Sequence, residues 1–557
     1  MTHSYSHRII SRSWLRKTAA LITAATLVLG TAACGTSASE TSAANGEPHN
    51  GGDLIFQIDS LGDNWVPNSS SISSFQGNIW GEITDKLVYV DEKGEISPWI
   101  AESWEESEDA TTFTLHLKDG VTFSDGSALD AEAVVANIDI WAKGAPDEGI
   151  SRIGLFPSSN YVKSTAIDST TVEVEFSAPT LGFIPTLGYH GSILISPDSL
   201  SNSIEEQGDL SNNIGSGPFV VESWANADFV TLKKREDYSW GPEARGHTGP
   251  AYLDSITYKQ IPETSLRAGS LQSNQADVVY NLTPQELSGL KNAGYNVATP
   301  KYLGFVQGYA LNTQVAPFDD VRVRQAFQRG IDRDQILETV YTEDWSSAQS
   351  FIQSNVPEST DNTDVFSYDP DLAKSLLDEA GWVEGTNGIR VKDGKTLSVT
   401  LFPNPYVSTS QAADELAAQQ LGDLGFDVNI QVYDVPTYTE RVNSNKEVQA
   451  KPISRSFVDA GTVAGVIVGA KEGDEDWFKV GTTDETLNRL ATNVLGSADR
   501  ENRAEDLDEL QKYILEQGLY IPLVDIVQRI YVTSPDLHDV TYNGLAYASF
   551  ATAWLER

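Results

Sequence analysis

The stretch that decides the fold covers residues 87–138 and reads LVYVDEKGEISPWIAESWEESEDATTFTLHLKDGVTFSDGSALDAEAVVANI. Within it, residues 111–117 alternate between apolar and polar side chains, with the phenylalanine and both leucines on one face. This period of two predicts a half-buried strand. Asp-Gly turns follow at residues 119 and 125, and Asp130 then predicts the cap of a helix with an apolar stripe. A strand, tight turns and a capped helix in succession indicate an α/β organisation.

Two later segments repeat this kind of organisation. Asp369 and the proline after it begin a predicted helix, which Gly381 ends. Residues 413–424 carry apolar side chains at helical spacing, Gly425 can end that helix, and residues 426–432 alternate as a strand. The chain shows no fixed-period internal repeat, which argues against solenoids and propellers. Helices interleaved with strands throughout predict an α/β fold class.

The composition narrows the class of partner. The chain has 557 residues, with 38 Lys+Arg against 79 Asp+Glu and a formal net charge of −41. Such a length suggests about three domains with large cores. The acidic excess works against nucleic acid and anionic membrane surfaces as partners, because both would be repelled electrostatically. A single cysteine excludes an internal disulfide and a metal centre built on several thiolates.

The first 33 residues are predicted to be a secretory signal. Four basic residues precede an uncharged apolar stretch, residues 18–33, which ends in small side chains. This stretch is too short to span a bilayer comfortably and precedes a small-residue cleavage site. Cleavage would remove four positive charges and no negative ones, so the mature chain would carry a net charge of −45.

Cys34 follows directly after these small residues, and the arrangement resembles the lipobox of bacterial lipoproteins, with Thr31 where leucine is usual. The resemblance implies that Cys34 is lipidated and becomes the mature N-terminus. The alternative is an ordinary secretory signal with an incidental cysteine. Residues 34–52 are rich in Gly, Ser, Ala and Thr, which predicts a flexible tether. No later segment approaches 18 uncharged apolar residues, so we expect only the N-terminus to hold the protein at the membrane.

Several segments, in order, resemble one family: the family 5 extracytoplasmic solute-binding proteins of ABC importers, which include oligopeptide-, dipeptide- and nickel-binding proteins. The most specific segment is the opening stretch, residues 87–138. GSGPFVVESW at 215–224 resembles the Gly-x-Gly-Pro-aromatic turn of the family. The further matching blocks are LNTQVAPFDDVRVRQAFQRGIDRDQI at 311–336, YDPDLAKSLLDEAGW at 368–382, the 411–432 unit and LYIPLVD at 519–525.

The resemblance implies a two-lobe, periplasmic-binding-protein-like fold of the large cluster C type of class II, with a hinge and an interlobe cleft. Projected onto this chain, lobe one would be residues 53–298 plus 529–557, and lobe two residues 299–528. In such proteins the lobes close on a solute, and the closed form delivers it to a membrane permease driven by an ATPase. We therefore expect a monomer without metal or cofactor, anchored to the outer leaflet of the bacterial cytoplasmic membrane.

An enzyme is the main alternative from another class. The histidines are scattered, with no His-Glu-x-x-His spacing, and no Gly-x-Ser-x-Gly elbow occurs. Carboxylates are too abundant for a glycosidase-like pair to stand out. The acidic run at 474–476 lacks the spaced oxygen ligands of a calcium loop, and a solvated loop is the better interpretation. We expect no enzymatic activity and keep a secreted hydrolase as the alternative.

Solute contacts are predicted first in ISRSFVDAGT, residues 453–462. Peptide-binding members of the family usually carry a Trp-x-x-Asp motif here, whose aspartate pairs with the α-amino group of the peptide. Asp459 matches that aspartate, whereas Ser456 stands where the tryptophan is expected. Arg455 adds a cation that could hold a carboxylate, sulfonate or phosphonate in a two-point contact. The alternative is that Arg455 and Asp459 only pair with each other.

The remaining candidates for solute binding share a polar or aromatic side chain, and the first four of them follow the first strand, in a segment that often lines the cleft in relatives. A tryptophan offers a large face with a hydrogen-bonding edge, although it competes with 11 others for that role. These candidates are Asn64, Trp65, Asn68 and Ser73 after the first strand, Tyr309 and Asn312 near the projected crossover, and Asn404 and Tyr406.

The sequence thus predicts a lipid-anchored receptor for a peptide or another small solute. After cleavage, Cys34 would be the only sulfur-bearing residue, because the single methionine is Met1. Resistance to oxidation and compositional drift would each explain this absence. A third explanation is economy in a protein made when sulfur is scarce, which favours an organosulfur anion as the alternative solute.

Overall fold

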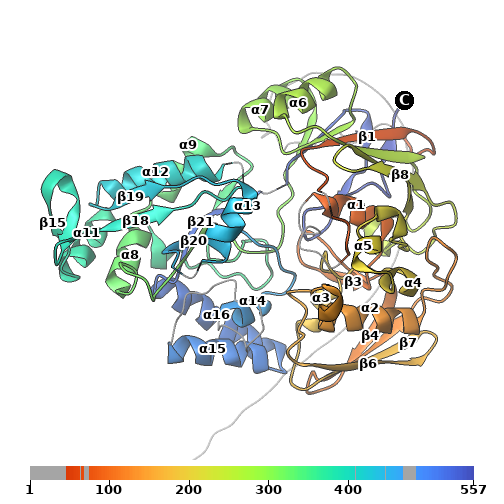
Figure 1. Ribbon diagram of the computed structural model, residues 1–557, viewed down its shortest axis with the longest axis horizontal. Coiled ribbons are helices and arrows are strands. Elements are labelled where there is room, and N and C mark those ends of the chain that lie inside the picture. Colours follow the sequence, from red (N-terminus) through yellow and green to blue (C-terminus); the bar gives the residue numbers. More distant parts are fainter. Residues whose placement is uncertain are drawn as a thin grey trace, which may run out of the picture. The chain divides into compact units, whose positions relative to one another are not determined.

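The computed structural model describes residues 46–62, 64–67, 75–407, 409–445, 447–467, 484–527 and 529–557. Cys34, Asn68, Ser73 and the acidic run at 474–476 lie outside these residues. Residues 46–557 form one compact unit of interleaved helices and strands (Figure 1).

A seven-stranded sheet contains strands from both the beginning and the end of the described chain. Its order is β12-β22-β11-β1-β10-β9-β8. Strand β1 is parallel to β10 and β11, and the other pairs are antiparallel. Strands β10 and β11 lie on either side of β1 and run in the same direction, so the chain must cross over between them. Helix α6, Thr264–Gln272, lies in this crossover connection. The strands are β1 Asp53–Ile58, β8 Phe219–Ala225, β9 Phe229–Lys234, β10 Ser255–Gln260, β11 Val278–Tyr280, β12 Asn296–Ala298 and β22 Tyr531–Thr533.

The stretch quoted first forms half of an antiparallel four-stranded sheet of order β4-β5-β7-β6. Strand β5, Thr112–Leu117, alternates between partly exposed and buried residues, as the period of two predicts. Helix α2, Ala131–Lys143, begins where expected, because the side chain of Asp130 accepts the backbone N–H of Ala133 at 3.0 Å. The other strands are β4 Ala101–Glu106, β6 Tyr161–Asp168 and β7 Thr171–Phe176.

A second four-stranded sheet has the order β14-β21-β13-β20 and is antiparallel throughout. Its strands are β13 Gln307–Leu311, β14 Ser346–Ser347, β20 Ala450–Ile453 and β21 Tyr520–Asp525. The chain passes from the seven-stranded sheet to this one between β12 and β13, and returns between β21 and β22. The lobe boundaries projected from the sequence remain a prediction.

The helix-to-strand unit predicted at 413–432 is present. Helix α12, Ser410–Gly422, leads through Gly425 into β19, Asp427–Ile430, which pairs in parallel with β18, Ser398–Leu401. Figure 1 shows α12 alongside these two strands. The strand is shorter than predicted: it ends at Ile430, and Val432, two residues further on, is 57% exposed. Helix α11, Pro370–Glu379, begins with an Asp369 cap, and the chain turns at Gly381 with a φ of +84°.

The remaining helices are short on average, and several carry side-chain caps. They are α1 Gln76–Ile83, α3 Phe183–Thr186, α4 Pro197–Leu200, α5 Ile204–Gln207, α7 Pro284–Asn292, α8 Val321–Arg329, α9 Arg333–Val340, α10 Thr363–Phe366, α13 Val435–Tyr438, α14 Thr462–Ile467, α15 Glu485–Gly496 and α16 Arg500–Glu516. The small strands are β2 Val88–Val90, β3 Ile96–Pro98, β15 Val383–Glu384, β16 Arg390–Lys392, β17 Lys395–Thr396, β23 Leu537–His538, β24 Thr541–Tyr542, β25 Ala548–Ser549 and β26 Trp554–Leu555.

The Gly-Ser-Gly segment at 215–217 owes its glycines to close backbone contact. A Cβ on Gly215 would lie 2.0 Å from the carbonyl oxygen of Ile83, and one on Gly217 would lie 2.5 Å from that of Glu82. Neither glycine has a positive φ. The segment therefore presses against the end of α1, where only a hydrogen atom fits. This contact positions Glu82 and its neighbours for the site described below.

Within the ranges that the structure describes, no helix combines the length and apolarity needed to cross a bilayer.

Candidate functional site

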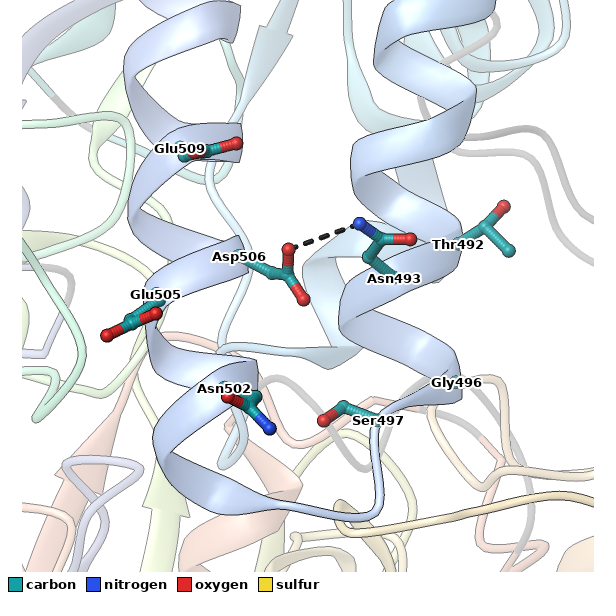
Figure 2. A pocket seen from close by; sticks show the side chains of 8 residues that line it. All are labelled: Thr492, Asn493, Gly496, Ser497, Asn502, Glu505, Asp506 and Glu509. Atoms are coloured by element: carbon teal, nitrogen blue, oxygen red, sulfur yellow. Dashed lines mark hydrogen bonds between the residues drawn. The ribbon is translucent and has the colours of Figure 1, made fainter.

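One hollow, of about 490 Å³, lies on the surface between α15 and α16 (Figure 2). Figure 2 shows Asn493 and Asp506 facing each other, joined by a hydrogen bond of 3.2 Å from Nδ2 to Oδ1. Glu505 and Glu509, which also line the hollow, are exposed. A small-molecule site is usually a concave pocket that buries most of its ligand. This open, acidic hollow lacks that enclosure, so it does not match a typical small-molecule site.

Asp459, the predicted α-amine anchor, forms an ion pair and hydrogen bonds with neighbouring side chains. Arg503 of α16 donates from Nη1 to Oδ1 at 2.7 Å and from Nη2 to Oδ2 at 2.6 Å. The backbone N–H and the hydroxyl of Thr462 donate to Oδ2 at 2.9 and 3.0 Å. Oδ2 thus accepts three of these hydrogen bonds, and Oδ1 accepts one. The partner of Asp459 is therefore Arg503, and the alternative pairing with Arg455 is wrong.

A small cavity borders this ion pair. Its volume is about 110 Å³, and its lining includes Pro185, Leu303 and Phe457 together with Asp459 and Arg503. A space of this size holds roughly three or four water molecules and is well below the usual volume of a ligand pocket. It lies where two segments distant in the sequence meet, since a Cβ on Gly182 would lie only 2.6 Å from Oδ2 of Asp459.

The same two segments also bring other polar groups together. Tyr189 is 4% exposed, and burial raises the pKa of its hydroxyl, which the nearby side chains of Arg455 and Ser456 partly oppose. The ring of His190 lies against that of Tyr189, with 3.8 Å between their centroids. Burial and the nearby charges of Arg529, Arg455 and Lys86 hold the pKa of His190 well below its ordinary value. His190 is therefore neutral here and faces cations from three separate segments.

Arg529 closes one side of this group. It lies in the connection between β21 and β22, is 3% exposed, and its guanidinium lies 4.0 Å from the ring centroid of Tyr547. The Tyr302 ring lies 6.0 Å away on another segment. Stacking on aromatic faces stabilises a buried guanidinium.

Lys86 and Arg245 extend the group toward the end of α1. The guanidinium of Arg245 lies 5.1 Å from the ring of Trp99, and the ammonium of Lys86 lies 5.9 Å from the same ring. Nη1 of Arg245 donates to Oγ of Ser549 at 2.9 Å. Burial and the charge of Arg245 lower the pKa of Lys86 to about 8. We call Lys86, His190, Arg245, Arg455 and Arg529 the cationic cluster.

Two buried carboxyls lie at the α1 end of the cationic cluster. Burial raises the pKa of Glu82 to about 7, against the opposing effects of the Phe550 backbone N–H and the cations Arg245 and Lys86. Burial also raises the pKa of Asp85 to about 6, although Tyr238 and Trp240 donate to it at 2.9 and 2.8 Å. Both carboxyls act on Lys86, whereas the charges that shift His190 are all cationic.

Some donors of the cationic cluster are buried without a protein partner. Among the described residues, Nε and Nη2 of Arg245 and Nδ1 of His190 have no hydrogen-bond partner. The two residues are 7% and 8% exposed. Buried polar groups in folded proteins are nearly always hydrogen-bonded, so such atoms require an explanation. Across the described residues, no group of three or more His, Cys, Asp and Glu side chains could hold a metal ion.

The structure distributes the other predicted site residues over several places. Tyr309 is fully buried, and its hydroxyl donates to Asp414. Asn404 donates to Oγ of Ser454 at 3.2 Å, one residue before Arg455. Asn312 donates to a backbone carbonyl at 3.2 Å in the core. Trp65 is 1% exposed and packs against other tryptophans, Asn64 is exposed, and Tyr406 is 45% exposed.

Of the predicted residues, only Arg455 belongs to the cationic cluster. Roles in solute binding for all ten candidates remain predictions. Sequence analysis missed Lys86, His190, Arg245 and Arg529, because each stands in a different segment and none belongs to a recognisable motif. One signal in the sequence could have pointed to these residues. Basic residues are scarce in this acidic chain, so each basic residue in an otherwise apolar segment is a candidate for a functional role.

The chain resembles known proteins both in sequence and in fold. A family model described as bacterial extracellular solute-binding proteins, family 5 Middle, matches residues 95–450. Curated relatives include the glutathione-binding protein GsiB of Escherichia coli strain K12 and that of Shigella flexneri, each 29% identical over 349 residues. The match covers 62% of this chain, and the chain spans about 63% of the length of these relatives.

Solved structures show the same fold. NikA from Brucella suis, in complex with Fe(III)-EDTA, has a TM-score of 0.75 at 22% identity, covering 90% of this chain and 100% of that one. The oligopeptide-binding protein AppA from Bacillus subtilis, in complex with a nonapeptide, has a TM-score of 0.75 at 23% identity, covering 92% and 100%. The predicted α/β, periplasmic-binding-protein-like fold class is confirmed. Because the family model also matches more than half of its residues, the chain belongs to the bacterial extracellular solute-binding proteins of family 5.

Proposed function

We propose that this protein is the solute receptor of an ABC importer, which captures a peptide or another small solute and delivers it to a membrane permease. Membership of family 5 supports this proposal, and the buried polar atoms of Arg245 and His190 that lack a partner among the described residues carry it. Burying a donor without a partner costs stability, so such donors are rare in folded proteins. In a receptor, the bound solute can supply the missing acceptors.

The proposed mechanism uses the two-lobe division projected above, with lobe two at residues 299–528. Arg455 would then lie in lobe two, His190 and Lys86 in lobe one, and Arg529 where the chain returns. A solute that touches both sides binds the closed form better than the open form, and it can shift the equilibrium only by that difference in affinity. The ion pair between Arg500 and Glu106, at 2.6 Å, would join the two lobes at the surface.

We propose no catalytic role for the protein. The described residues that cluster in the interior are basic side chains, aromatic rings and the carboxyls Glu82 and Asp85, and we assign no nucleophile among them. A secreted hydrolase remains the alternative, and it differs in one measurable respect: a hydrolase would convert the solute that it binds.

The solute is proposed to be a peptide or a small organic molecule. Since the relatives are named glutathione-binding proteins, glutathione is the first peptide to test. An organosulfur anion is the second candidate, favoured by the absence of methionine after Met1. Expression measured under sulfate-replete and sulfate-starved growth tests a role in sulfur supply, and equal levels would argue against that role.

The proposed location is outside the cytoplasm, with the protein anchored as a monomer to the outer leaflet of the bacterial cytoplasmic membrane through lipidated Cys34 and the tether at 34–52. Residues 1–33 would be the signal peptide. Replacing Cys34 by alanine should release the protein into the medium, and retention at the membrane would contradict lipidation.

The experiment for the receptor proposal is calorimetric titration of the purified protein with glutathione, dipeptides, alkanesulfonates and neutral sugars, combined with product analysis. We expect saturable one-to-one binding of one class and no conversion. A bound solute at 100 times its Kd should stabilise the fold by about 2.7 kcal/mol, which raises the Tm measurably. Turnover of the bound solute, or the absence of binding by every class, would overturn the proposal.

A further inference from the structure

We infer that residues 46–52 form a strap, which docks on Trp554 and makes the edge of lobe one around this tryptophan the membrane-proximal part of the anchored receptor. The orientation toward the membrane rests on the proposed function and its lipid anchor at Cys34, whereas the strap itself stands on contacts within the described fold.

The strap begins as an extension of strand β1. The backbone N–H of Gly51 donates to the carbonyl oxygen of Tyr252 at 2.8 Å. The N–H of Asp254 donates to the carbonyl oxygen of Gly52 at 2.9 Å. These hydrogen bonds lie just ahead of the parallel pairing between β1 and β10 and continue it. The seven-stranded sheet therefore holds the C-terminal end of the strap.

Two glycines let the strap pass close to the C-terminal strands. The φ angles of Gly51 and Gly52 are +117° and +105°, in the region that favours glycine. A Cβ on Gly52 would lie 3.2 Å from Cδ1 of Leu555, in strand β26. The chain ahead of β1 thus lies against β26.

Trp554, the neighbour of Leu555 in β26, holds the N-terminal end of the strap. The ring centroid of His49 lies 5.2 Å from that of Trp554, and a Cβ on Gly46 would lie only 2.5 Å from Cη2 of the indole. His538 packs against the same indole at 4.4 Å, and Nε1 of Trp554 donates to Oδ2 of Asp539 at 2.7 Å. Trp554 is 1% exposed. A large aromatic ring that is buried and fixed in this way stabilises the segments that pack on it.

These contacts all attach the strap to one lobe. Their partners lie at residues 252–254, just ahead of β10, and at 554–555, in β26. The projected division assigns both places to lobe one, residues 53–298 plus 529–557. An anchor that is tied to lobe one leaves lobe two free to move when the receptor closes on a solute.

Docking of the strap also shortens the tether. Residues 35–45 connect Cys34 to the strap and span at most about 40 Å when fully extended. Without docking, residues 35–52 would connect Cys34 to β1 and could span about 65 Å. The acidic surface does not draw the protein toward anionic lipids. The docked strap therefore limits how far the Trp554 edge can lie from the bilayer.

Protease trimming tests the strap. Proteinase K shortens an exposed chain end until hydrogen-bonded or buried backbone stops it. N-terminal sequencing of the resistant product should find a start near Gly46. Trp554→Leu should move this start by about six residues, to near Gly52, because it removes the docking surface. Trp104→Leu, on strand β4, is the matched control and should be trimmed like the wild type.

A second variant keeps the trimming test decisive. Gly46→Val alters only the strap, and its larger side chain does not fit against Trp554. It should also move the start to near Gly52, and it decides the matter if Trp554→Leu fails to fold. A wild type that is trimmed to Gly52, or identical products from all variants, would overturn the strap.

Energy transfer tests the orientation. The lipidated protein is placed in phosphatidylcholine vesicles that carry an acceptor dye, with a donor dye on one introduced cysteine. Glu556→Cys, where the glutamate side chain is 59% exposed, labels the Trp554 edge. Lys395→Cys labels β17, whose sheet includes β15, and Figure 1 shows β15 on the side of the molecule opposite the C-terminus. We expect stronger transfer from position 556 than from position 395.

The outcomes separate the strap, the anchor and the receptor function. Equal transfer from the two positions, or stronger transfer from position 395, would overturn the orientation. A protein that carries no lipid on Cys34 would refute the proposed anchor and the orientation together, while the trimming result alone decides the strap. Failure of every solute to bind would refute the receptor function and leave the strap standing.

Discussion

Arg503 and Asp459 form a buried, two-point ion pair, with N–O distances of 2.7 and 2.6 Å, at the place where the family resemblance predicts a free carboxylate. The pair links α16 to the segment after β20, and Gly182 packs against it. The position that would serve a peptide amine is therefore part of the fold itself.

Replacing Arg503 by methionine should lower the free energy of unfolding by about 3–5 kcal/mol, because it leaves the Asp459 charge buried and unpaired. Urea denaturation measures this change. The double variant Arg503→Met with Asp459→Leu should regain much of the loss, since it removes both charges. Arg489→Met, at an exposed position, serves as the control and should change stability by less than about 0.5 kcal/mol. A loss below about 1 kcal/mol in the single variant would show that the pair contributes little.

Asp459 should also contribute to acid unfolding. Burial raises its pKa, but Arg503 and Thr462 outweigh burial and hold the pKa below its ordinary value of 3.8. The folded state thus binds the proton more weakly than the unfolded state, so the stabilisation is present above pH 3.8 and is lost as pH falls through the folded pKa. The stability difference between the wild type and Asp459→Asn should shrink over that range, and a constant difference would contradict the assignment.

Glu82 should make the protein less stable as pH rises. Its pKa is about 7 in the fold against an ordinary value of 4.5, so its stability contribution is full below pH 4.5 and is lost as pH rises through 7. Glu82→Gln keeps the acceptor for the Phe550 N–H and removes the titration, so it should gain about 3 kcal/mol relative to wild type at pH 8. Denaturation curves from pH 4.5 to 8 measure this difference. Parallel pH profiles would show that Glu82 is not the titrating group.

His190 should have the opposite pH dependence. Burial, reinforced by Arg529, Arg455 and Lys86, lowers its pKa well below 6.5. Its contribution is present above pH 6.5 and is lost as pH falls through the folded pKa, because the unfolded state binds the proton first. His190→Gln should therefore lose less stability in acid than the wild type. His116→Gln, at a half-exposed strand position, is the matched control, and an equal effect from both variants would argue against a role for burial.

Gly217→Ala should destabilise the fold by about 1–3 kcal/mol or more, since the new Cβ would lie 2.5 Å from a backbone carbonyl of α1 that cannot move freely. Gly269→Ala is the control, because it lies within α6, a Cβ there meets nothing within 4 Å, and alanine favours helix. The control should gain up to about 1 kcal/mol by thermal or urea unfolding. A neutral Gly217 variant would mean that α1 shifts at little cost.

Local features of the fold were accessible from the sequence. The alternation at 112–117, the Asp130 cap and the Asp369 start of α11 follow from side-chain period and capping chemistry, which act over a few residues. The far end of the predicted strand after α12 was not accessible, because pairing with β18 ends at Ile430 and leaves Val432 exposed.

The candidate site, like the fold, was only partly predictable from the sequence. The sequence by itself determined the family, the closeness of Arg455 and Asp459 along the chain, and the acidic character of the chain. Only the tertiary structure decided that Asp459 pairs with Arg503, 44 residues away, and that His190, Lys86 and Arg529 gather near Arg455. The physical reason is that charge pairing and burial depend on distance in space, and residues from separate segments acquire that proximity only when the whole chain packs.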